Sequence, residues 1–266
     1  TSKKICLDTE GAQLRTGMFA GDVLRLQTHS YIEFSESNFS FKNKIIPLSI
    51  ANMNNVLKPG DLLKIDFHSV IVQIVEIKKK RIIARVIKGG VIGPNKGISV
   101  DRELHLPGFT EKDLKSFEIA KKLDILNFAI SFTESKKHVI DLRNSFNNEI
   151  TVISKIESIV GMKNLKEICL ESDSILIDRG DLSRQIPIER IAFAQKYIQS
   201  KAIKYNTPVY VATNLLESMV SNYRPTRAEV NDISDTLVSG VSGLVLAAET
   251  AIGKYPVESV NMVASI

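Results

Sequence analysis

The stretch Ile150-Thr-Val-Ile-Ser-Lys-Ile-Glu157 decides the fold class of this chain. It begins with apolar, mostly β-branched residues and ends with the charged residues Lys155 and Glu157. A second stretch, Ser174-Ile-Leu-Ile-Asp-Arg-Gly-Asp181, follows the same pattern. Both are typical of buried strands that stop at charged residues. The carboxyl ends of successive parallel strands meet at one mouth of a barrel, so we expect Lys155, Glu157 and Asp181 to converge there.

Strands and helices alternate along the chain after about residue 108. Apolar strands are expected near 124–130, 150–155, 174–178, 208–212 and 243–247. Helices are expected at 111–122, 134–146, 162–171, 188–205, 226–239 and 256–266. A further strand at 3–8 completes six βα units, which predicts an α/β fold with a parallel TIM (β/α)₈-type barrel. A closed barrel needs two more units, so either further barrel strands precede Thr1, which we expect, or the sheet is not a full barrel.

Residues 17–104 differ from the rest of the chain in their pattern of apolar and polar residues. Short alternating apolar stretches, such as Val70-Ile-Val-Gln-Ile-Val75, are separated by turn signals such as Pro59-Gly60-Asp61. Many short strands with regular turns indicate a small all-β barrel or sandwich. We therefore expect a barrel domain in two parts, 1–16 and 105–266, with an all-β domain inserted at 17–104.

Composition excludes several classes of protein. The net charge is only +5, aromatic residues make up 6% of the 266 residues, and Trp is absent. The longest basic run, Lys78-Lys-Lys-Arg81, is interpreted as a solvated turn, so no nucleic-acid partner is expected. No apolar run reaches the roughly 18 residues of a membrane span. Cys6 and Cys169 are far apart and are interpreted as buried, reduced thiols, which favours a cytoplasmic location.

Side chains at the strand ends suit a divalent cation and an anionic substrate. Glu157 and Asp181 offer the carboxylate oxygens that Mg²⁺ and Mn²⁺ prefer. Lys155 would then lie where negative charge builds on a transferring group. From the residues alone, a surface ion pair between Lys155 and Glu157 stays open as the alternative.

Two further segments carry candidate polar groups. Thr213 and Asn214 follow the expected strand at 208–212 and could orient a substrate, although a helix-capping role is an equal alternative. Asp8 and Thr9 offer oxygens to a cation, and Arg15 offers a planar fork for a phosphate or carboxylate. For this second segment the alternative is a turn of mixed charges.

Several motifs together exceed what chance would supply. They are Leu7-Asp-Thr-Glu-Gly-Ala-Gln-Leu-Arg-Thr-Gly17, Gly93-Pro-Asn-Lys-Gly97, Ile153-Ser-Lys-Ile-Glu157, Arg179-Gly-Asp-Leu182, Ala212-Thr-Asn-Leu-Leu-Glu-Ser-Met219, Arg224-Pro-Thr-Arg-Ala-Glu229, and Glu249-Thr250 with Gly253-Lys-Tyr-Pro256. By these motifs the chain resembles pyruvate kinase over nearly its whole length. The resemblance implies a (β/α)₈ barrel with the inserted β domain as a mobile lid. It also implies transfer of a phosphoryl group from phosphoenolpyruvate to ADP, which yields pyruvate and ATP in glycolysis.

The resemblance implies a role for each matching residue. Glu157 and Asp181 look like the ligands of Mg²⁺ or Mn²⁺, and Lys155 looks like the catalytic lysine. Thr213 matches the threonine near the proton-transfer step, and Arg15 matches an arginine that touches the transferred phosphate.

The remaining matches concern cations, the nucleotide and the substrate carboxylate. Asp8 and Thr9 match half of a potassium site. Lys96 matches a lysine that reaches the nucleotide phosphates, and the amides of Gly180 and Asp181 would hold the substrate carboxylate. The family assembles as oligomers, partly through a carboxyl-terminal domain that we expect to be absent from this chain, so a homo-oligomer stays open.

A few positions depart from the family pattern: Gln13, Phe67, Glu134, Asn214 and Ala247. Gln13 leaves the potassium requirement open, and Ala247 lacks a hydroxyl near the proton-relay water. Changes around an intact site typically cost about 10–100-fold, so a slowed enzyme is expected. Two alternatives stay open: a binding or assembly protein with weakened catalysis, and an enzyme that acts on another enolate or oxoacid.

Overall fold

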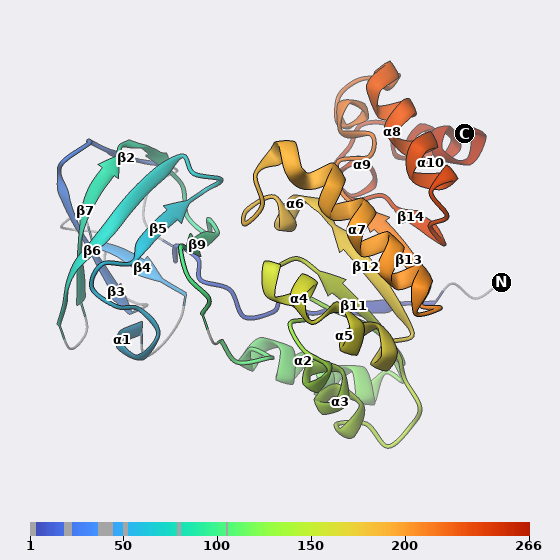
Figure 1. Ribbon diagram of the computed structural model, residues 1–266, viewed down its shortest axis with the longest axis horizontal. Coiled ribbons are helices and arrows are strands. Elements are labelled where there is room, and N and C mark those ends of the chain that lie inside the picture. Colours follow the sequence, from blue (N-terminus) through green and yellow to red (C-terminus); the bar gives the residue numbers. More distant parts are fainter. Residues whose placement is uncertain (1–3, 19–22, 37–44, 50–52, 79–80, 105) are drawn as a thin grey trace. The chain divides into compact units, whose positions relative to one another are not determined.

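The computed structural model describes residues 4–18, 23–36, 45–49, 53–78, 81–104 and 106–266. The middle of the basic run, Lys79 and Lys80, lies outside the described residues. The chain divides into two compact units: Thr1–Gly11 with Gly108–Ile266, and Ala12–Pro107. We call the first the α/β unit and the second the β unit, and each is described by itself (Figure 1).

The α/β unit is built on one parallel sheet. Its strands are β1 (Cys6–Asp8), β10 (Asn127–Ile130), β11 (Thr151–Ile156), β12 (Ser174–Asp178), β13 (Val209–Ala212) and β14 (Gly243–Val245). They pair in this order, and every pair is parallel. Strand order that follows chain order is the arrangement of a (β/α)₈ barrel. The six predicted strands and the predicted fold class are confirmed, because these strands form a half-barrel of that type.

Helices follow the strands along the α/β unit. They are α2 (Glu111–Lys122), α3 (Lys136–Asn144), α4 (Ile159–Lys163), α5 (Leu165–Glu171), α6 (Arg179–Leu182), α7 (Ile191–Lys204), α8 (Arg227–Val238), α9 (Ala248–Ala251) and α10 (Pro256–Ser265). Short 3₁₀ helices, η1 (Ile188–Arg190) and η2 (Glu217–Val220), precede α7 and α8. Capping boxes at Thr110 with Asp113 and at Thr226 with Glu229 fix the starts of α2 and α8,.

The buried core of the α/β unit fixes the strands, and so the positions of the charged residues at their carboxyl ends. All five residues of β12 are buried, as the continuous apolar run predicts for a strand covered on both faces,. Ile156, Ile175 and Ile177 pack with Ile198 of α7 in one core cluster. The two cysteines differ: Cys169 is buried, whereas Cys6 is exposed. The expectation of a buried Cys6 was wrong, because β1 is an edge strand of the described sheet.

The β unit is mostly antiparallel. Its strands are β2 (Leu24–Leu26), β3 (Tyr31–Glu36), β4 (Ile45–Leu48), β5 (Leu62–Ile65), β6 (Val70–Lys78), β7 (Arg81–Lys88), β8 (Gly90–Ile92) and β9 (Ile98–Val100), with the short helix α1 (Met53–Val56). They form a six-stranded sheet, β4-β3-β7-β6-β5-β9, and a two-stranded sheet, β2-β8. Alternate residues of β6, Val70, Val72 and Ile74, are buried in the core of this unit,.

Candidate active site

Lys155 and Glu157 lie together at the carboxyl end of β11. Their side chains share one side of the strand, and Lys155 Nζ lies 3.2 Å from Glu157 Oε1. Lys155 is only 8% exposed, and Glu157 is fully buried. Burial alone would lower the pKa of Lys155, but the carboxylates of Glu157, Asp8 and Asp178 raise it above its usual range. Lys155 is therefore a fixed positive charge in this site.

Glu157 has one satisfied oxygen and one oxygen without a hydrogen-bond donor. Phe132 N donates to Oε2 at 2.6 Å, while Oε1 has only the ion pair with Lys155 in the described structure. Burial raises the pKa of this carboxyl to about 8, against the opposing effect of Lys155 and with further contributions from Asp178 and Asp181. A cation beside Oε1 would favour the ionised form of Glu157.

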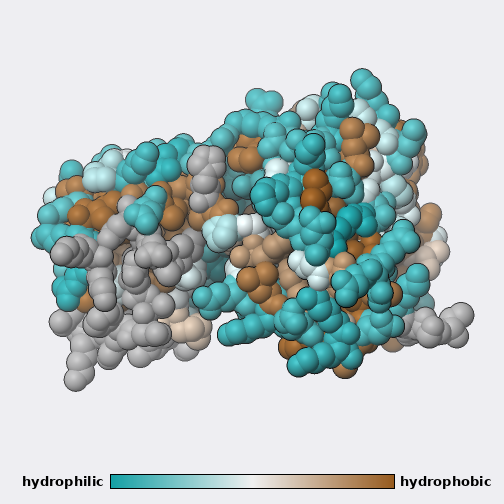
Figure 2. All heavy atoms as spheres, turned by 90° about the horizontal axis from the view of Figure 1, so that it is seen from below, coloured by the Kyte–Doolittle hydropathy of each residue, from teal (hydrophilic) through white to brown (hydrophobic). Residues whose placement is uncertain are grey.

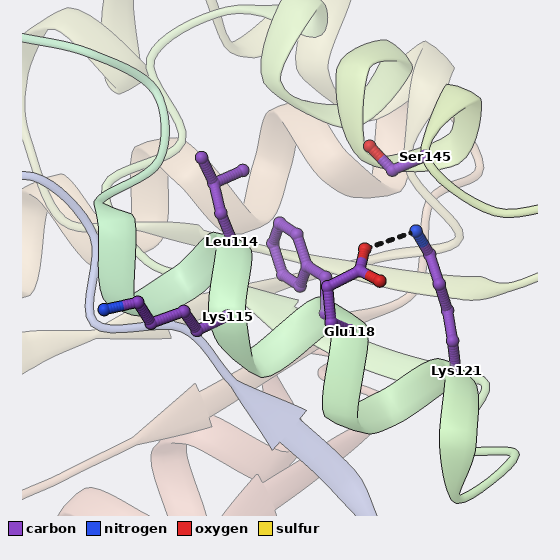
Figure 3. A pocket seen from close by; sticks show the side chains of 6 residues that line it. Leu114, Lys115, Glu118, Lys121 and Ser145 are labelled. Carbon is purple, nitrogen blue, oxygen red and sulfur yellow. Dashed lines mark hydrogen bonds and ion pairs between the residues drawn. The ribbon is translucent and has the colours of Figure 1, made fainter.

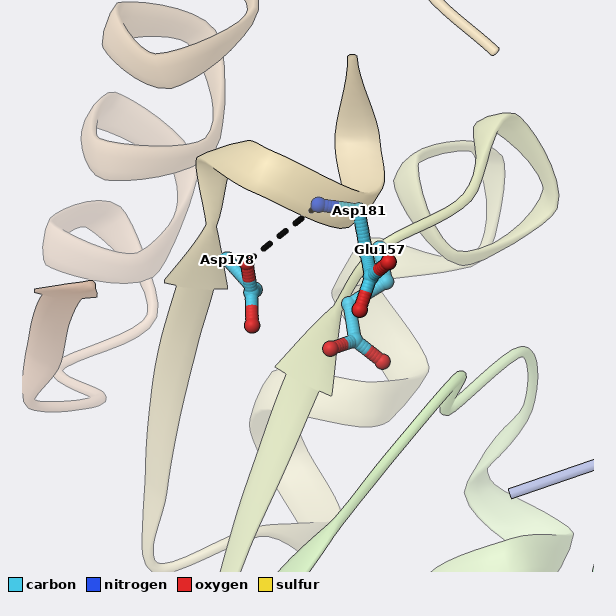
Figure 4. A group of neighbouring side chains, drawn as sticks. All are labelled: Glu157, Asp178 and Asp181. Carbon is cyan, nitrogen blue, oxygen red and sulfur yellow. Dashed lines mark hydrogen bonds between the residues drawn. The ribbon is translucent and has the colours of Figure 1, made fainter. Parts of the chain in front are cut away.

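Three acidic residues converge beside Lys155. Glu157, Asp178 and Asp181 each place one carboxylate oxygen within 4.8 Å of the others (Figure 4). They come from the end of β11, the end of β12 and the start of α6. Asp178 Oδ2 lies 3.8 Å from Lys155 Nζ, and Asp181 pairs with Arg184 at 2.8 Å. A set of three carboxylates suits Mg²⁺ or Mn²⁺. Glu157 Oε1, which accepts no hydrogen bond, could coordinate such a cation.

Thr213 is held at the end of β13 in an unusual conformation. Its φ of 67° and the φ of 51° at Asn214 place two successive non-glycine residues in the left-handed region,. Its hydroxyl accepts from Gly180 N at 2.8 Å and lies 3.1 Å from Asp178 Oδ1. The structure therefore brings Thr213, Gly180 and Asp178 into one hydrogen-bonded group.

Arg179 anchors this loop through hydrogen bonds to its backbone carbonyl oxygens. Its Nε and Nη2 donate to the carbonyl oxygen of Thr213 at 3.0 and 2.7 Å, and Nη2 also donates to that of Asn214 at 2.7 Å. Nη1 pairs with Asp232 of α8 at 2.5 Å. Since Arg179 is only 7% exposed, this network anchors the Thr213 loop in a protected environment,.

Asp8 and Thr9 lie beside the lysine but are engaged by protein groups. Both carboxylate oxygens of Asp8 accept from Lys155 Nζ, at 3.3 and 3.2 Å. The hydroxyl of Thr9 accepts from Ser131 N at 2.9 Å, and Ser131 Oγ donates to the Thr9 carbonyl at 2.7 Å. Lys155 Nζ also lies 3.2 Å from Ser131 Oγ.

Arg15 and Lys96 belong to the β unit, where each contacts another residue of the same unit. Arg15 Nη1 donates to the carbonyl oxygen of Asn95 at 3.2 Å. Lys96 Nζ pairs with Asp66 at 3.4 Å. The structure thus gathers Lys155, Glu157, Asp181, Thr213, Gly180, Asp8 and Thr9 within the α/β unit, and it describes Arg15 and Lys96 within the other unit.

Comparisons with known proteins decide the family. Residues 1–260 match the family described as "Pyruvate kinase, barrel domain". The chain belongs to the pyruvate kinase family. It is 31% identical to a pyruvate kinase of Thermotoga maritima and 35% identical to one of Clostridium acetobutylicum, each over 98% of this chain and 57% of the relative. A crystal structure of a pyruvate kinase from Cryptosporidium parvum superposes with a TM-score of 0.85 at 32% identity, covering 98% of this chain and 56% of that one.

The chain spans a little over half the length of the pyruvate kinases that it matches. The resemblance to the pyruvate kinase family stated from the motifs is confirmed by these matches. The family assignment applies to the α/β and β units that the chain contains.

Sequence reasoning missed three members of the site. Asp178, Ser131 and Arg179 were not assigned any role, although all three lie at or just beyond strand ends. Finding Asp178 requires the register between neighbouring strands. Lys155 pairs with Leu176 and Ile156 with Ile177, so Glu157 falls level with Asp178 on the neighbouring strand. Strand register between βα units cannot be read from a sequence alone.

The positions that depart from the pyruvate kinase pattern have clear local environments. Asn214 Nδ2 donates to Glu217 at 2.6 Å, and Glu134 N lies 3.4 Å from His138 Nδ1. Ala247 N donates to the buried Glu249, which also accepts from Leu216 N. Glu249 therefore ties the loop after β13 to the start of α9. Phe67 lies in the turn between β5 and β6, where Asp66, Phe67 and His68 all have positive φ.

A pocket of about 280 Å³ lies elsewhere, on α2 (Figure 3). It is lined by Leu114, Lys115, Phe117, Glu118, Lys121 and Ser145. Glu118 and Lys121 form an ion pair at 2.7 Å beside this pocket, and Glu157, Asp178 and Asp181 do not line it.

Hydrophilic residues cover much of the face shown in Figure 2, with hydrophobic residues interspersed. In the described part of the chain no helix has both the length and the apolar character to cross a membrane.

Proposed function

We propose that this protein is a pyruvate kinase, which transfers a phosphoryl group from phosphoenolpyruvate to ADP and forms pyruvate and ATP. The observation that carries the proposal is the convergence of Lys155 with the carboxylates of Glu157 and Asp181 at the ends of β11 and β12. Phosphoryl transfer needs positioning and charge neutralisation more than covalent chemistry. A fixed ammonium beside a carboxylate set that suits a divalent cation supplies both.

Glu157 and Asp181 would hold Mg²⁺ or Mn²⁺, which prefer carboxylate oxygens. When bound, the cation would supply Lewis-acid stabilisation of the charge that develops during transfer. Lys155, fully protonated because of its carboxylate neighbours, stabilises the phosphoryl group in flight and the enolate oxygen left behind,. The bond between phosphorus and the enol oxygen breaks, its electron pair stays on that oxygen, and a new bond forms to the β-phosphate oxygen of ADP.

The enolate then takes up a proton at its methylene carbon to become pyruvate. Thr213 is the residue of this chain proposed to act near that step. Its hydroxyl is oriented by the Gly180 amide and the Asp178 carboxylate, and its backbone is anchored by Arg179. The backbone amides of Gly180 and Asp181 are proposed to hold the substrate carboxylate, Arg15 the transferred phosphate and Lys96 the nucleotide phosphates.

Potassium is proposed as a second cation near Asp8 and Thr9. In the described structure the Asp8 carboxylate pairs with Lys155 and the Thr9 hydroxyl bonds to Ser131. Recruitment of potassium would therefore require Asp8 to divide its oxygens between Lys155 and the cation. A homo-oligomer and a cytoplasmic location are further expectations of the family assignment, and sizing chromatography tests the first.

The test is pyruvate formation from phosphoenolpyruvate by the protein as its gene encodes it. We expect turnover that requires ADP and a divalent cation, measured with and without potassium. Absence of pyruvate with Mg²⁺, Mn²⁺ and potassium present would contradict the proposal. Calorimetric binding of the cation and phosphoenolpyruvate without product would instead favour the binding or assembly protein, and turnover of another oxoacid would favour the third alternative.

A further inference from the structure

Carboxyl groups gather at the ends of β11 and β12. Asp8, Glu157 and Asp178 lie within 4 Å of Lys155, and Asp181 pairs with Arg184. Glu157 is fully buried and Asp178 is 8% exposed. Buried carboxylates are normally compensated by a cation or a full set of hydrogen bonds. A divalent cation would compensate the carboxylates of Glu157, Asp178 and Asp181.

Asp178 is placed to share that cation. Strand register puts Asp178 level with Glu157, since Ile156 pairs with Ile177 in the preceding row. One oxygen each from Glu157, Asp178 and Asp181 falls within 4.8 Å of the others. Oxygens coordinating Mg²⁺ at about 2.0–2.1 Å lie at most about 4.2 Å apart, so small side-chain adjustments suffice. The buried Glu157 Oε1 accepts no hydrogen bond in the described structure and could contact a cation in addition to its ion pair with Lys155.

Protein contacts hold Asp178 in position before any ligand binds. Its Oδ1 accepts from Asp181 N at 3.3 Å and from the Thr213 hydroxyl at 3.1 Å. Its Oδ2 lies 3.8 Å from Lys155 Nζ, beyond hydrogen-bond distance. Hydrogen bonds to Oδ1 thus orient the Asp178 carboxylate, while Oδ2 lies on the side of Lys155. A carboxylate that is oriented through one oxygen and offers the other is typical of a preorganised metal ligand.

We propose that Asp178 is a third protein ligand of the divalent cation, so that this chain binds Mn²⁺ or Mg²⁺ through three carboxylates before substrate arrives. The inference rests on the proposed function for Glu157 and Asp181 and adds a residue of this chain to their site. Three anionic ligands bind a hard cation more tightly than two, and they leave fewer positions for substrate oxygens. The cation is therefore bound by the protein alone, without phosphoenolpyruvate or nucleotide.

The experiment titrates Mn²⁺ alone into the protein as encoded, by calorimetry and by the electron paramagnetic resonance signal of free Mn²⁺. Asp178→Asn keeps an oxygen for Asp181 N and Thr213 but removes the charge, and Asp178→Ala removes both. We expect each variant to weaken Mn²⁺ binding at least about tenfold, because loss of even an indirect partner costs that much. Asp235→Ala, an exposed aspartate of α8, is the matched control and should bind Mn²⁺ like the parent.

Two results would overturn the proposal: unchanged Mn²⁺ affinity in both Asp178 variants, or no Mn²⁺ binding by the parent. Thermal melts followed by circular dichroism, without metal, check that both variants are folded. If Asp178→Ala does not fold, the Mn²⁺ affinity of Asp178→Asn decides the question. The readout is independent of turnover. If phosphotransfer failed while Asp178→Asn still weakened Mn²⁺ binding, the third ligand would stand and the proposed activity would fall.

Discussion

The guanidinium of Arg179 holds the carbonyl oxygen of Thr213 through two hydrogen bonds, from Nε at 3.0 Å and from Nη2 at 2.7 Å. Thr213 has a φ of 67°, a conformation that is strained for a β-branched residue,. Such strain costs on the order of 1–3 kcal/mol and persists only where surrounding contacts enforce it. Arg179 therefore keeps the Thr213 hydroxyl beside Gly180 and Asp178.

Arg179→Lys should impair the proton-transfer step more than substrate binding. Lysine keeps the charge but cannot donate to both carbonyl oxygens in the planar geometry of the guanidinium. We expect kcat to fall by about tenfold or more while KM for phosphoenolpyruvate changes little, because Thr213 is proposed to act after the substrate is bound. Steady-state kinetics measure this split, and Arg190→Lys, at an exposed position of η1, is the control. An equal effect of both substitutions would contradict the role of Arg179.

Asp61 makes the β unit sensitive to acid. It accepts from Arg102 Nε and Nη2, both at 2.8 Å, and from Lys58 N at 2.8 Å. Burial alone would raise the pKa of Asp61, but these donors hold it below its usual range. A carboxyl with a lowered pKa stabilises the fold above its unfolded pKa, and that stability is lost as the pH falls through the folded value.

Asp61→Asn should therefore weaken the β unit by about 1–3 kcal/mol at neutral pH. Hydrogen exchange of the amides of β5 and β9 measures the effect. The difference from the parent should shrink as the pH falls from about 6 to about 3, because the parent carboxyl becomes protonated. A difference that is constant over this range would show that the Asp61 charge is not the cause.

Asp113 fixes the segment that follows β1. It is 2% exposed and accepts from Glu10 N at 2.7 Å, Gly11 N at 3.2 Å and Thr110 N at 2.9 Å. Asp113→Ala leaves these amides without their acceptor and removes the side-chain half of the capping box of α2, so we expect a loss of about 2–4 kcal/mol,. Urea denaturation followed by far-UV circular dichroism measures this loss. Exposed Asp235→Ala should be neutral, and a neutral Asp113→Ala would refute the structural role.

Much of the α/β unit follows from the sequence because its signals are local. The apolar run of β12 ends abruptly in Asp178, and α2 begins and ends where Thr110 and the last lysines place it. The convergence of Lys155 and Glu157 follows from side-chain alternation at one strand end. These inferences need no knowledge of which strand pairs with which.

The rest depends on contacts between distant segments. Asp8 reaches Lys155 across 147 positions of sequence, and Arg179 reaches Asn214 across 35. From the sequence Asp178 could be assigned only to its strand, because the residues around it do not show that it lies level with Glu157 on the neighbouring strand. Burial of Glu157, which raises its pKa, likewise comes from packing by segments that a single stretch of sequence does not identify,.

The most direct test of the central claim compares the parent with Lys155→Met in ADP-dependent release of pyruvate from phosphoenolpyruvate. Methionine keeps most of the volume and removes the charge that lies 3.2 Å from Glu157. We predict turnover by the parent with Mg²⁺ or Mn²⁺ and a loss of about 100–1,000-fold in kcat for Lys155→Met, of the order seen when a charge-stabilising group is removed. Equal turnover by the two proteins would contradict the claim that Lys155 carries the chemistry.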